Sequence, residues 1–239
     1  MRIAEIFASI QGEGRWAGTP STFVRVSGCN LRCAWCDTPY ASWSPEGPSM
    51  DVGAIAARVA ELGVRHVVLT GGEPMLFEGV VPLAERLAEG EHVVTVETAG
   101  TVFRELPCAL MSISPKLANS TPVESGTAGT NGPAPRGWRE RHEAIRSNLE
   151  PLRRLVAAYD VQLKFVVDPE GSGDDLTEIE EVLRRLGGIP SDRVMLMAEG
   201  TDSETLARRE RLLVPVCLER GFRLSPRLHV HWFGNTRGT

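Results

Sequence analysis

The sequence has few aromatic residues, no long apolar run and no excess of positive charge. Phe, Trp and Tyr make up 6% of its 239 residues. No apolar stretch approaches the roughly 20 residues that a membrane span needs, which excludes an integral membrane protein. Lys and Arg number 26 against 31 Asp and Glu, a net charge of −5 that argues against a nucleic-acid-binding protein. The first residues also lack the basic-then-apolar pattern of a signal peptide, so we expect a cytoplasmic protein.

The rest of the composition is that of an ordinary globular protein. Hydrophobic residues make up 42% of the chain and charged residues 24%. A chain of this length suits one sizeable domain, and we expect residues 1–239 to form it.

Cysteine is scarce but concentrated. Three of the five cysteines, Cys29, Cys33 and Cys36, fall within eight residues. A disulfide framework would favour an even, dispersed set in a secreted chain, so this cluster points to a metal site or to redox chemistry. Cys108 and Cys217 lie in apolar surroundings and are expected to be small buried hydrophobic residues.

Short β-branched runs alternate with amphipathic stretches along the chain. The pattern predicts strands at 22–28, 66–70, 92–97, 108–114, 161–167 and 193–197, and helices at 51–62, 82–88, 139–158, 174–186 and 203–220. This alternation predicts an α/β fold of βα units with a parallel sheet. Periodicity alone leaves an open doubly wound sheet and a partial barrel as alternatives, and both place the chemistry at the carboxyl ends of the strands. Pro215 is expected to kink or end the last helix.

One segment interrupts this alternation. Residues 118–137 are dense in Gly, Pro, Ser and Thr and have almost nothing to bury, which predicts an inserted flexible loop. Both a surface linker and an active-site lid fit that composition, and the position directly after Ser-Pro-Lys slightly favours a lid.

The cysteine spacing is Cys-x3-Cys-x2-Cys, with Trp35 before the last cysteine. Structural zinc needs four protein ligands, and the nearest histidine, His66, lies thirty residues further on. A four-iron cluster held by three cysteines keeps one iron open for a non-protein ligand. This spacing resembles the radical S-adenosylmethionine (SAM) superfamily, and Thr70-Gly-Gly-Glu-Pro74 resembles its second motif. The resemblance implies a partial (β/α) barrel of about six parallel strands, a [4Fe-4S] cluster and SAM.

Further motifs resemble the 7-carboxy-7-deazaguanine synthase (QueE) family over nearly the whole chain. They are Ile10-Gln-Gly-Glu-Gly14, Arg25, Cys36-Asp-Thr-Pro-Tyr40, Glu97-Thr98, Ser114-Pro-Lys116, Met197-Ala-Glu-Gly200 and the stretch from Leu224 through His229 to Thr239. The resemblance implies a lyase that contracts 6-carboxy-5,6,7,8-tetrahydropterin to 7-carboxy-7-deazaguanine with loss of ammonia, on the route to queuosine in tRNA. Ala198 stands where many relatives have proline, which affects local loop geometry alone.

The same resemblance assigns roles to individual residues. Cys29, Cys33 and Cys36 would bind the cluster, and the Thr38 hydroxyl would bind a Mg²⁺ ion. The SAM site would be formed by Trp35, Cys36, Asp37, Gly72, Ser114, Pro115, Lys116, Met197, Ala198, Glu199 and Gly200. The pterin would be bound by Ile10, Gln11, Gly12, Arg25, Thr70, His229 and Thr239. Glu13 and Glu97 are unranked candidates for proton transfer during ammonia loss.

Family analogy also suggests partners. We expect a flavodoxin- or ferredoxin-type reductant and a homodimer, with no membrane and no direct nucleic-acid partner. Two other functions remain open. One is a glycyl-radical-enzyme activase, which shares the cysteine spacing, and the other is a non-catalytic iron–sulfur or zinc module.

Overall fold

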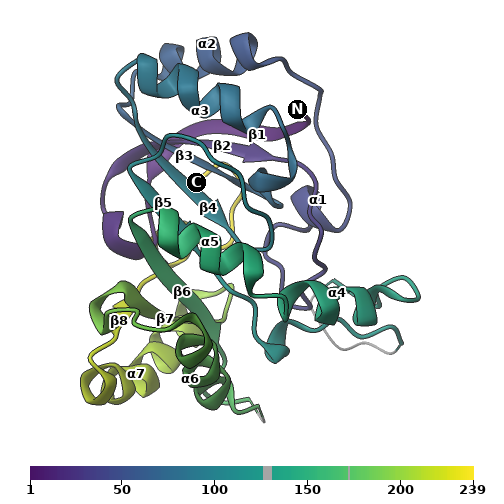
Figure 1. The fold of residues 1–239 in the computed structure, drawn as a ribbon, viewed down its shortest axis with the longest axis vertical. Helices are drawn as coiled ribbons and strands as arrows, with labels where there is room; N and C mark the ends of the chain where they lie inside the picture. Colours follow the sequence, from purple (N-terminus) through teal and green to yellow (C-terminus); the bar gives the residue numbers. More distant parts are fainter. Residues whose placement is uncertain (126–130, 172) are drawn as a thin grey trace.

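A single sheet carries the whole fold, with helices packed along its outer side (Figure 1). The structure is a computed structural model that describes residues 1–125, 131–171 and 173–239. The sheet has eight strands, β1 (Ile3–Ile10), β2 (Pro20–Val26), β3 (His66–Gly71), β4 (Val93–Thr98), β5 (Leu110–Ile113), β6 (Val161–Val167), β7 (Val194–Ala198) and β8 (Arg223–Ser225). In the described part of the chain, no helix is both long and apolar enough to cross a membrane.

The strand order identifies the architecture. The strands lie side by side in chain order from β1 to β8, β1 is antiparallel to β2, and every later pair is parallel. Without a reversal of strand order, successive crossovers place their helices on the same face, unlike a doubly wound sheet. Between the described strands, β8 does not pair with β1, so the sheet is a partial barrel rather than a closed one.

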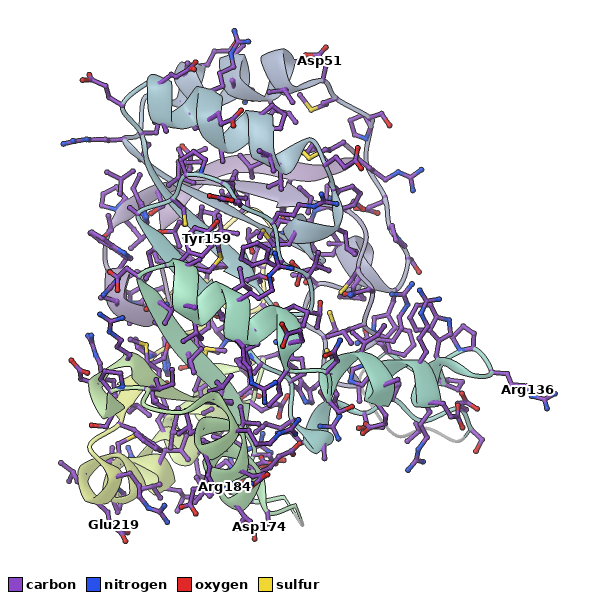
Figure 2. The ribbon with its side chains drawn as sticks, in the orientation of Figure 1. Asp51, Arg136, Tyr159, Asp174, Arg184 and Glu219 are labelled. Carbon is purple, nitrogen blue, oxygen red and sulfur yellow. The ribbon has the colours of Figure 1, made fainter. Side chains whose placement is uncertain are left out.

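Eight helices complete the fold. They are α1 (Pro39–Ser42), α2 (Val52–Leu62), α3 (Val80–Glu89), α4 (Trp138–Arg146), α5 (Glu150–Ala158), α6 (Asp175–Leu186), α7 (Ser203–Arg220) and α8 (Leu228–Phe233), all within the described residues. In Figure 1, α2 and α3 cover one end of the sheet, α5 the middle and α6 with α7 the other end, while α4 projects sideways. Figure 2 places Asp51, whose side chain caps the first turn of α2, at the outer edge of the molecule.

The sequence predicts the six central strands correctly but misses both edges. β1 and β8 were not predicted, so the sheet has seven parallel strands and one antiparallel strand in place of about six parallel ones. β8 has three residues, too few for a recognisable alternation. β1 lies directly before the Gln-Gly-Glu motif and ends at Ile10.

Two helix predictions need correction. The helix predicted at 139–158 is divided into α4 and α5, because in a continuous helix Pro151 would have no N–H to donate to the Ser147 carbonyl and its ring would clash with that carbonyl. Asn148 Oδ1 instead accepts a hydrogen bond from the Glu150 N–H (3.2 Å). Of the two outcomes expected at Pro215, an end to α7 is excluded because the helix continues to Arg220, and a kink remains a prediction. Pro215 lies on the exposed face of α7, where water can satisfy the carbonyl that lacks its helical partner.

The segment 118–137 has buried residues and contacts that its composition did not predict. Ser120 and Ala134 are buried, and the Ser120 carbonyl accepts a hydrogen bond from the Ala34 N–H (2.9 Å). Asn131 donates through Nδ2 to the Cys36 carbonyl (2.9 Å). This segment therefore packs on the cysteine loop through its described residues, while residues 126–130 of the predicted flexible loop lie outside them.

The two faces of the sheet have different chemistry, and this positions the site. Outward side chains such as Leu69, Val96 and Phe165 belong to one apolar core beneath the helices. Inward side chains on the same strands are polar, including Thr70, Glu97 and Lys164, and they line a cavity. Burial on both faces is typical of parallel strands, but a polar inner face is suited to holding a polar ligand.

Candidate active site

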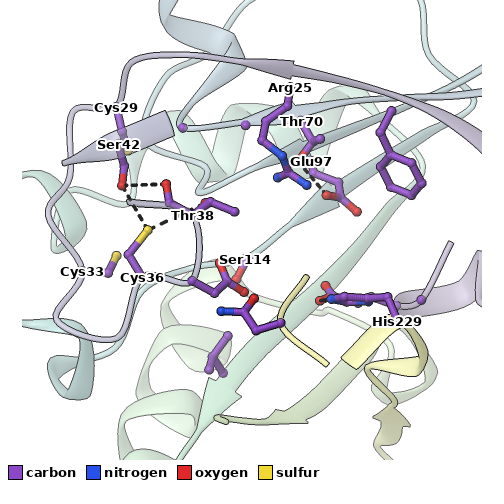
Figure 3. Close-up of a pocket in the computed structure, with 18 of the residues that line it drawn as sticks. Arg25, Cys29, Cys33, Cys36, Thr38, Ser42, Thr70, Glu97, Ser114 and His229 are labelled. Carbon is purple, nitrogen blue, oxygen red and sulfur yellow. Dashed lines mark hydrogen bonds and ion pairs between the residues drawn. The ribbon is translucent and has the colours of Figure 1, made fainter. Parts of the chain in front are cut away.

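A cavity lies at the carboxyl ends of the parallel strands, where ligand sites form in α/β folds. Its volume is about 460 Å³, which suits a cofactor or small substrate. Most residues that the sequence singles out line it, namely Ile10, Gln11, Gly12, Glu13, Arg25, Cys29, Cys33, Trp35, Cys36, Asp37, Thr38, Thr70, Gly72, Glu97, Ser114, Lys116, Met197, His229 and Thr239. Figure 3 shows the cysteines on one side of this cavity, Arg25, Thr70 and Glu97 on another, and His229 facing them.

The three cysteines lie on the loop that follows β2. The Cys36 N–H donates to the Cys33 carbonyl (3.2 Å), and the Cys36 Sγ lies 3.0 Å from the Ser42 Oγ at the end of α1. Throughout residues 1–125, 131–171 and 173–239, no three His, Cys, Asp or Glu side chains are grouped tightly enough for a single metal ion. An iron–sulfur cluster needs a wider arrangement, because each of its cysteines binds a different iron.

Burial dominates the protonation of these thiols. It raises the pKa of Cys29 to about 12, and it also raises the pKa of Cys33 and of Cys36. A metal centre reverses this preference because it deprotonates a coordinating thiol. Three buried soft ligands on one loop therefore fit a [4Fe-4S] cluster with one open iron. His66 is not a fourth ligand, since it begins β3 at the opposite end of the strand from Thr70, where it lies 2.6 Å from the Ser21 Oγ.

The turn after β3 requires its glycines. Gly71 has φ +132°, and a Cβ on Gly72 would lie 2.2 Å from the Gly28 carbonyl oxygen and 2.6 Å from that of Ala41. This close approach joins the turn to the backbone just before Cys29. Glu73 is fully buried and accepts hydrogen bonds from the Thr98 hydroxyl (2.7 Å) and the Ala99 N–H (2.8 Å), which tie the turn to β4.

Substitution of Gly72 by alanine is expected to displace the cysteine loop, because its Cβ would collide with backbone atoms that cannot rotate away. We expect the Gly72→Ala protein to bind SAM at least about tenfold more weakly, measured by equilibrium dialysis on the reconstituted protein. Gly90→Ala is the control, because its Cβ would meet ordinary contacts at 3.4 Å and it lies outside the cavity lining. Unchanged SAM binding in Gly72→Ala would contradict this account of the turn.

Four charged residues form a buried network at the inner side of the cavity. Glu13 is paired with Lys164 on β6, and the Arg227 Nε lies 3.3 Å from its Oε1. Arg227 also pairs with Asp37, next to Cys36. Burial by itself would raise the pKa of Glu13, but Lys164, Arg227 and His229 together lower it well below the ordinary value. Glu13 is therefore a carboxylate at neutral pH, and Arg227 connects it to the cysteine loop.

Glu97 has a different set of partners. Its carboxylate accepts hydrogen bonds from the Gln11 Nε2 (3.1 Å) and from the Thr70 hydroxyl (2.8 Å). Both donors are neutral and also line the cavity. Glu97 thus joins the first motif to the strand that precedes the glycine turn.

His229 and two phenylalanines form further parts of the wall. A Cβ on Gly12 would lie 2.2 Å from the His229 Nδ1, so the glycine allows the histidine to lie against the first motif. The rings of Phe7 and Phe23 are stacked with centroids 5.2 Å apart, and both line the cavity. The cavity therefore combines an apolar side with charged and hydrogen-bonding groups, as expected for a planar polar ligand.

Comparisons with known proteins agree with this site. A sequence model of the radical SAM superfamily matches residues 23–120, which include the three cysteines and the glycine turn. A 7-carboxy-7-deazaguanine synthase from Rhodopirellula baltica is 45% identical over 99% of this chain and 88% of its own length. One from Halobacterium salinarum is 46% identical over 95% of this chain and 88% of its own. The chain belongs to the 7-carboxy-7-deazaguanine synthase family.

Membership in this family makes the chain a radical SAM lyase whose cofactors are a [4Fe-4S] cluster and SAM. The crystal structure of QueE from Escherichia coli matches with a TM-score of 0.61 at 24% identity, over 94% of this chain and 92% of that one. This likeness confirms the partial barrel expected from the sequence.

Some residues assigned by resemblance to this synthase family lie outside the cavity lining, namely Pro115, Ala198, Glu199 and Gly200. The Glu199 side chain pairs with Arg209, and the Gly200 carbonyl accepts a hydrogen bond from Arg227. Their SAM-binding roles remain predictions.

Sequence reasoning also missed several residues of the cavity and its charged network, namely Phe7, Phe23, Tyr40, Ser112, Lys164 and Arg227. Lys164 could have been found from the sequence. In the otherwise apolar strand Val-Gln-Leu-Lys-Phe-Val-Val, Gln162 and Lys164 are two residues apart and therefore lie on the same face.

Proposed function

We propose that this protein contracts the ring of 6-carboxy-5,6,7,8-tetrahydropterin to give 7-carboxy-7-deazaguanine, with loss of ammonia. The observation that carries the proposal is a single cavity lined by the three cysteines, Thr38, Arg25 and Glu97. When bound, the cluster and SAM would supply a 5′-deoxyadenosyl radical for abstraction of the hydrogen atom at C6 of the pterin. Loss of ammonia from the pterin needs no net oxidant, so a hydrogen atom would be returned before the turnover ends.

The chain itself contributes placement and electrostatics. Arg25 can hold a planar anion through its paired donors, and Gln11 and Thr70 offer hydrogen-bonding groups along the same wall. Thr38 would bind a Mg²⁺ ion that meets the substrate carboxylate, as a hard cation with few protein ligands does.

The charged network ranks the two candidates for proton transfer. Glu13 is held as a carboxylate by Lys164 and Arg227, so it is a poor proton donor at neutral pH. Glu97 lines the cavity and accepts hydrogen bonds from Gln11 and Thr70, so we assign it the transfer of a proton during ammonia loss.

Anaerobic reconstitution with iron and sulfide tests the activity. The protein is supplied with SAM, dithionite, Mg²⁺ and 6-carboxytetrahydropterin, and mass spectrometry measures 7-carboxy-7-deazaguanine and 5′-deoxyadenosine. Formation of 7-carboxy-7-deazaguanine that depends on SAM and on dithionite supports the proposal, with or without accompanying 5′-deoxyadenosine. Deoxyadenosine alone would move the assignment to a glycyl-radical-enzyme activase. The absence of both products would favour a non-catalytic module.

Replacing Thr38 by alanine is expected to remove the response of turnover to Mg²⁺, because Thr38 supplies the hydroxyl ligand. Product formation should fall by roughly tenfold or more at saturating substrate, while the iron content stays at the wild-type level. Thr177→Ala is the matched control, since its hydroxyl bonds Asp174 on the exposed surface of α6. Full Mg²⁺-dependent turnover in Thr38→Ala would contradict this ligand assignment.

We also propose a redox partner and an oligomeric state. A small acidic flavodoxin or ferredoxin would reduce the cluster, and two copies of the chain would form a homodimer in the cytoplasm. The net charge of −5 and the small-molecule cavity support a protein that binds neither tRNA nor membranes. Size-exclusion chromatography with light scattering tests the dimer, and a monomer at micromolar concentration would contradict it.

A further inference from the structure

The start of β1 contains an irregularity that sets the position of Glu5. Ile3 pairs with Val26 and Glu5 pairs with Arg25, so Ala4 is an extra residue in this antiparallel pair. A bulge of this kind reverses the alternation of side chains. Ile3 consequently packs in the core, while Glu5 lies on the same face as Phe7 and opposite Arg25.

Glu5 then contacts three side chains of the cavity wall. Its Oε1 accepts hydrogen bonds from the Arg25 Nε (2.6 Å) and from the Tyr40 hydroxyl (2.6 Å). Its Oε2 lies 3.4 Å from the Arg237 Nε. The Glu5 and Arg25 side chains are only 12% and 17% exposed, so this pair is largely shielded from water. Because Glu5 engages Nε, the two terminal nitrogens of Arg25 are left for a ligand, and among the described residues they have no hydrogen-bond partner.

Arg237 attaches the C-terminal segment 234–239 to the same place. Its guanidinium lies 4.2 Å from the centre of the Tyr40 ring, pairs with Glu46 and donates to the Ala4 carbonyl (3.0 Å). That carbonyl belongs to the extra residue of the bulge. Residues 235–239 line the cavity, so Arg237 holds a part of the wall in place.

We propose that Glu5 is a positioning residue that orients Arg25 toward the pterin and couples this orientation to the seating of segment 234–239 through Arg237. The inference rests on the proposed function for its substrate, but the coupling itself is a property of this chain. The Glu5 carboxylate binds both Arg25 and Arg237. Loss of its charge therefore weakens the orientation of Arg25 and the attachment of segment 234–239 together. Glu5 does not itself line the cavity, and its effect reaches the substrate through Arg25.

Steady-state kinetics separate this role from a general structural one. Glu5→Gln keeps the size of the side chain and is expected to raise KM for the pterin about tenfold while kcat stays within about twofold. Arg237→Ala should raise KM by about fivefold in the wild-type background and by less than about twofold in the Glu5→Gln background. The matched controls are Glu61→Gln and Arg58→Ala, an exposed ion pair on α2 that should leave both constants unchanged.

Hydrogen–deuterium exchange provides a readout independent of activity. The Gly234 amide, which donates to the Val230 carbonyl (2.9 Å) at the start of segment 234–239, should exchange at least about tenfold faster in Glu5→Gln and in Arg237→Ala than in the wild type. Unchanged exchange in both variants, a fall in kcat at constant KM, or fully additive effects in the double variant would overturn the proposal. A wild-type enzyme that makes no deazaguanine would instead refute the proposed function, and exchange would still decide whether Glu5 holds the segment.

Discussion

Replacing Cys33 by alanine is expected to abolish SAM cleavage and product formation, by at least about a thousandfold. Cys33 is buried, lines the cavity and lies on the same short loop as Cys29 and Cys36. With two thiols left, a second iron loses its protein ligand and the cluster is not retained. The measurement is the iron content and visible absorbance of the reconstituted protein, followed by chromatography of 5′-deoxyadenosine.

Two other cysteines provide the control for this experiment. Cys108 and Cys217 do not line the cavity, and Cys217 is buried in the apolar core. Cys108→Ala should retain the cluster and wild-type SAM cleavage. A Cys33→Ala protein that still held four irons and cleaved SAM would contradict the assignment of the ligands.

Replacing Glu13 by glutamine is expected to destabilise the fold by about 3 kcal/mol, because it leaves the buried cations Lys164 and Arg227 without their shared carboxylate. For a chain of this size, the loss corresponds to a thermal midpoint lower by roughly 10 °C. Differential scanning calorimetry measures it. The exposed Glu61→Gln on α2 should change stability by less than about 0.5 kcal/mol.

The double variant Glu13→Gln, Lys164→Met extends this test. It removes both members of the Glu13–Lys164 pair, so Lys164 no longer leaves an unpaired buried charge. Part of the stability lost in Glu13→Gln should therefore return. A double variant as unstable as the sum of the two single variants would show that the pair is not coupled.

The pH dependence of stability has a defined sign for Glu13. Its pKa in the folded protein lies below the ordinary value of 4.5, because Lys164, Arg227 and His229 outweigh the effect of burial. The stabilisation is therefore complete above that ordinary value and is lost as the pH falls toward the folded pKa. The wild type should lose stability on acidification below about pH 5, and Glu13→Gln should show a shallower loss.

The sequence predicts the central part of the fold because local pattern and burial agree there. β2 to β7 are short apolar runs between glycine or helix signals, and each was predicted within a few residues. The break before α5 was missed because amphipathic spacing continues across Pro151. The bulge at Ala4 has no marker in the sequence, since it depends on pairing with a strand twenty residues away.

The site likewise contains residues that could be predicted from the sequence and residues that could not. The cysteines and Gly72 follow from motifs whose spacing reflects their chemistry, and the structure brings them to one cavity. Glu5 meets Arg25, and Lys164 and Arg227 meet Glu13, only in three dimensions. Their roles depend on charges that compensate one another across the barrel, which a one-dimensional pattern does not contain.

Hydrogen transfer from the substrate tests the central claim most directly. The reconstituted enzyme is given 6-carboxytetrahydropterin deuterated at C6, and mass spectrometry follows the label. We predict 7-carboxy-7-deazaguanine together with deuterium in SAM and in 5′-deoxyadenosine, because the hydrogen atom taken from C6 is carried on the cofactor before a hydrogen atom is returned. Unlabelled deoxyadenosine without the deazaguanine would contradict this prediction, because the radical would then act on some other molecule.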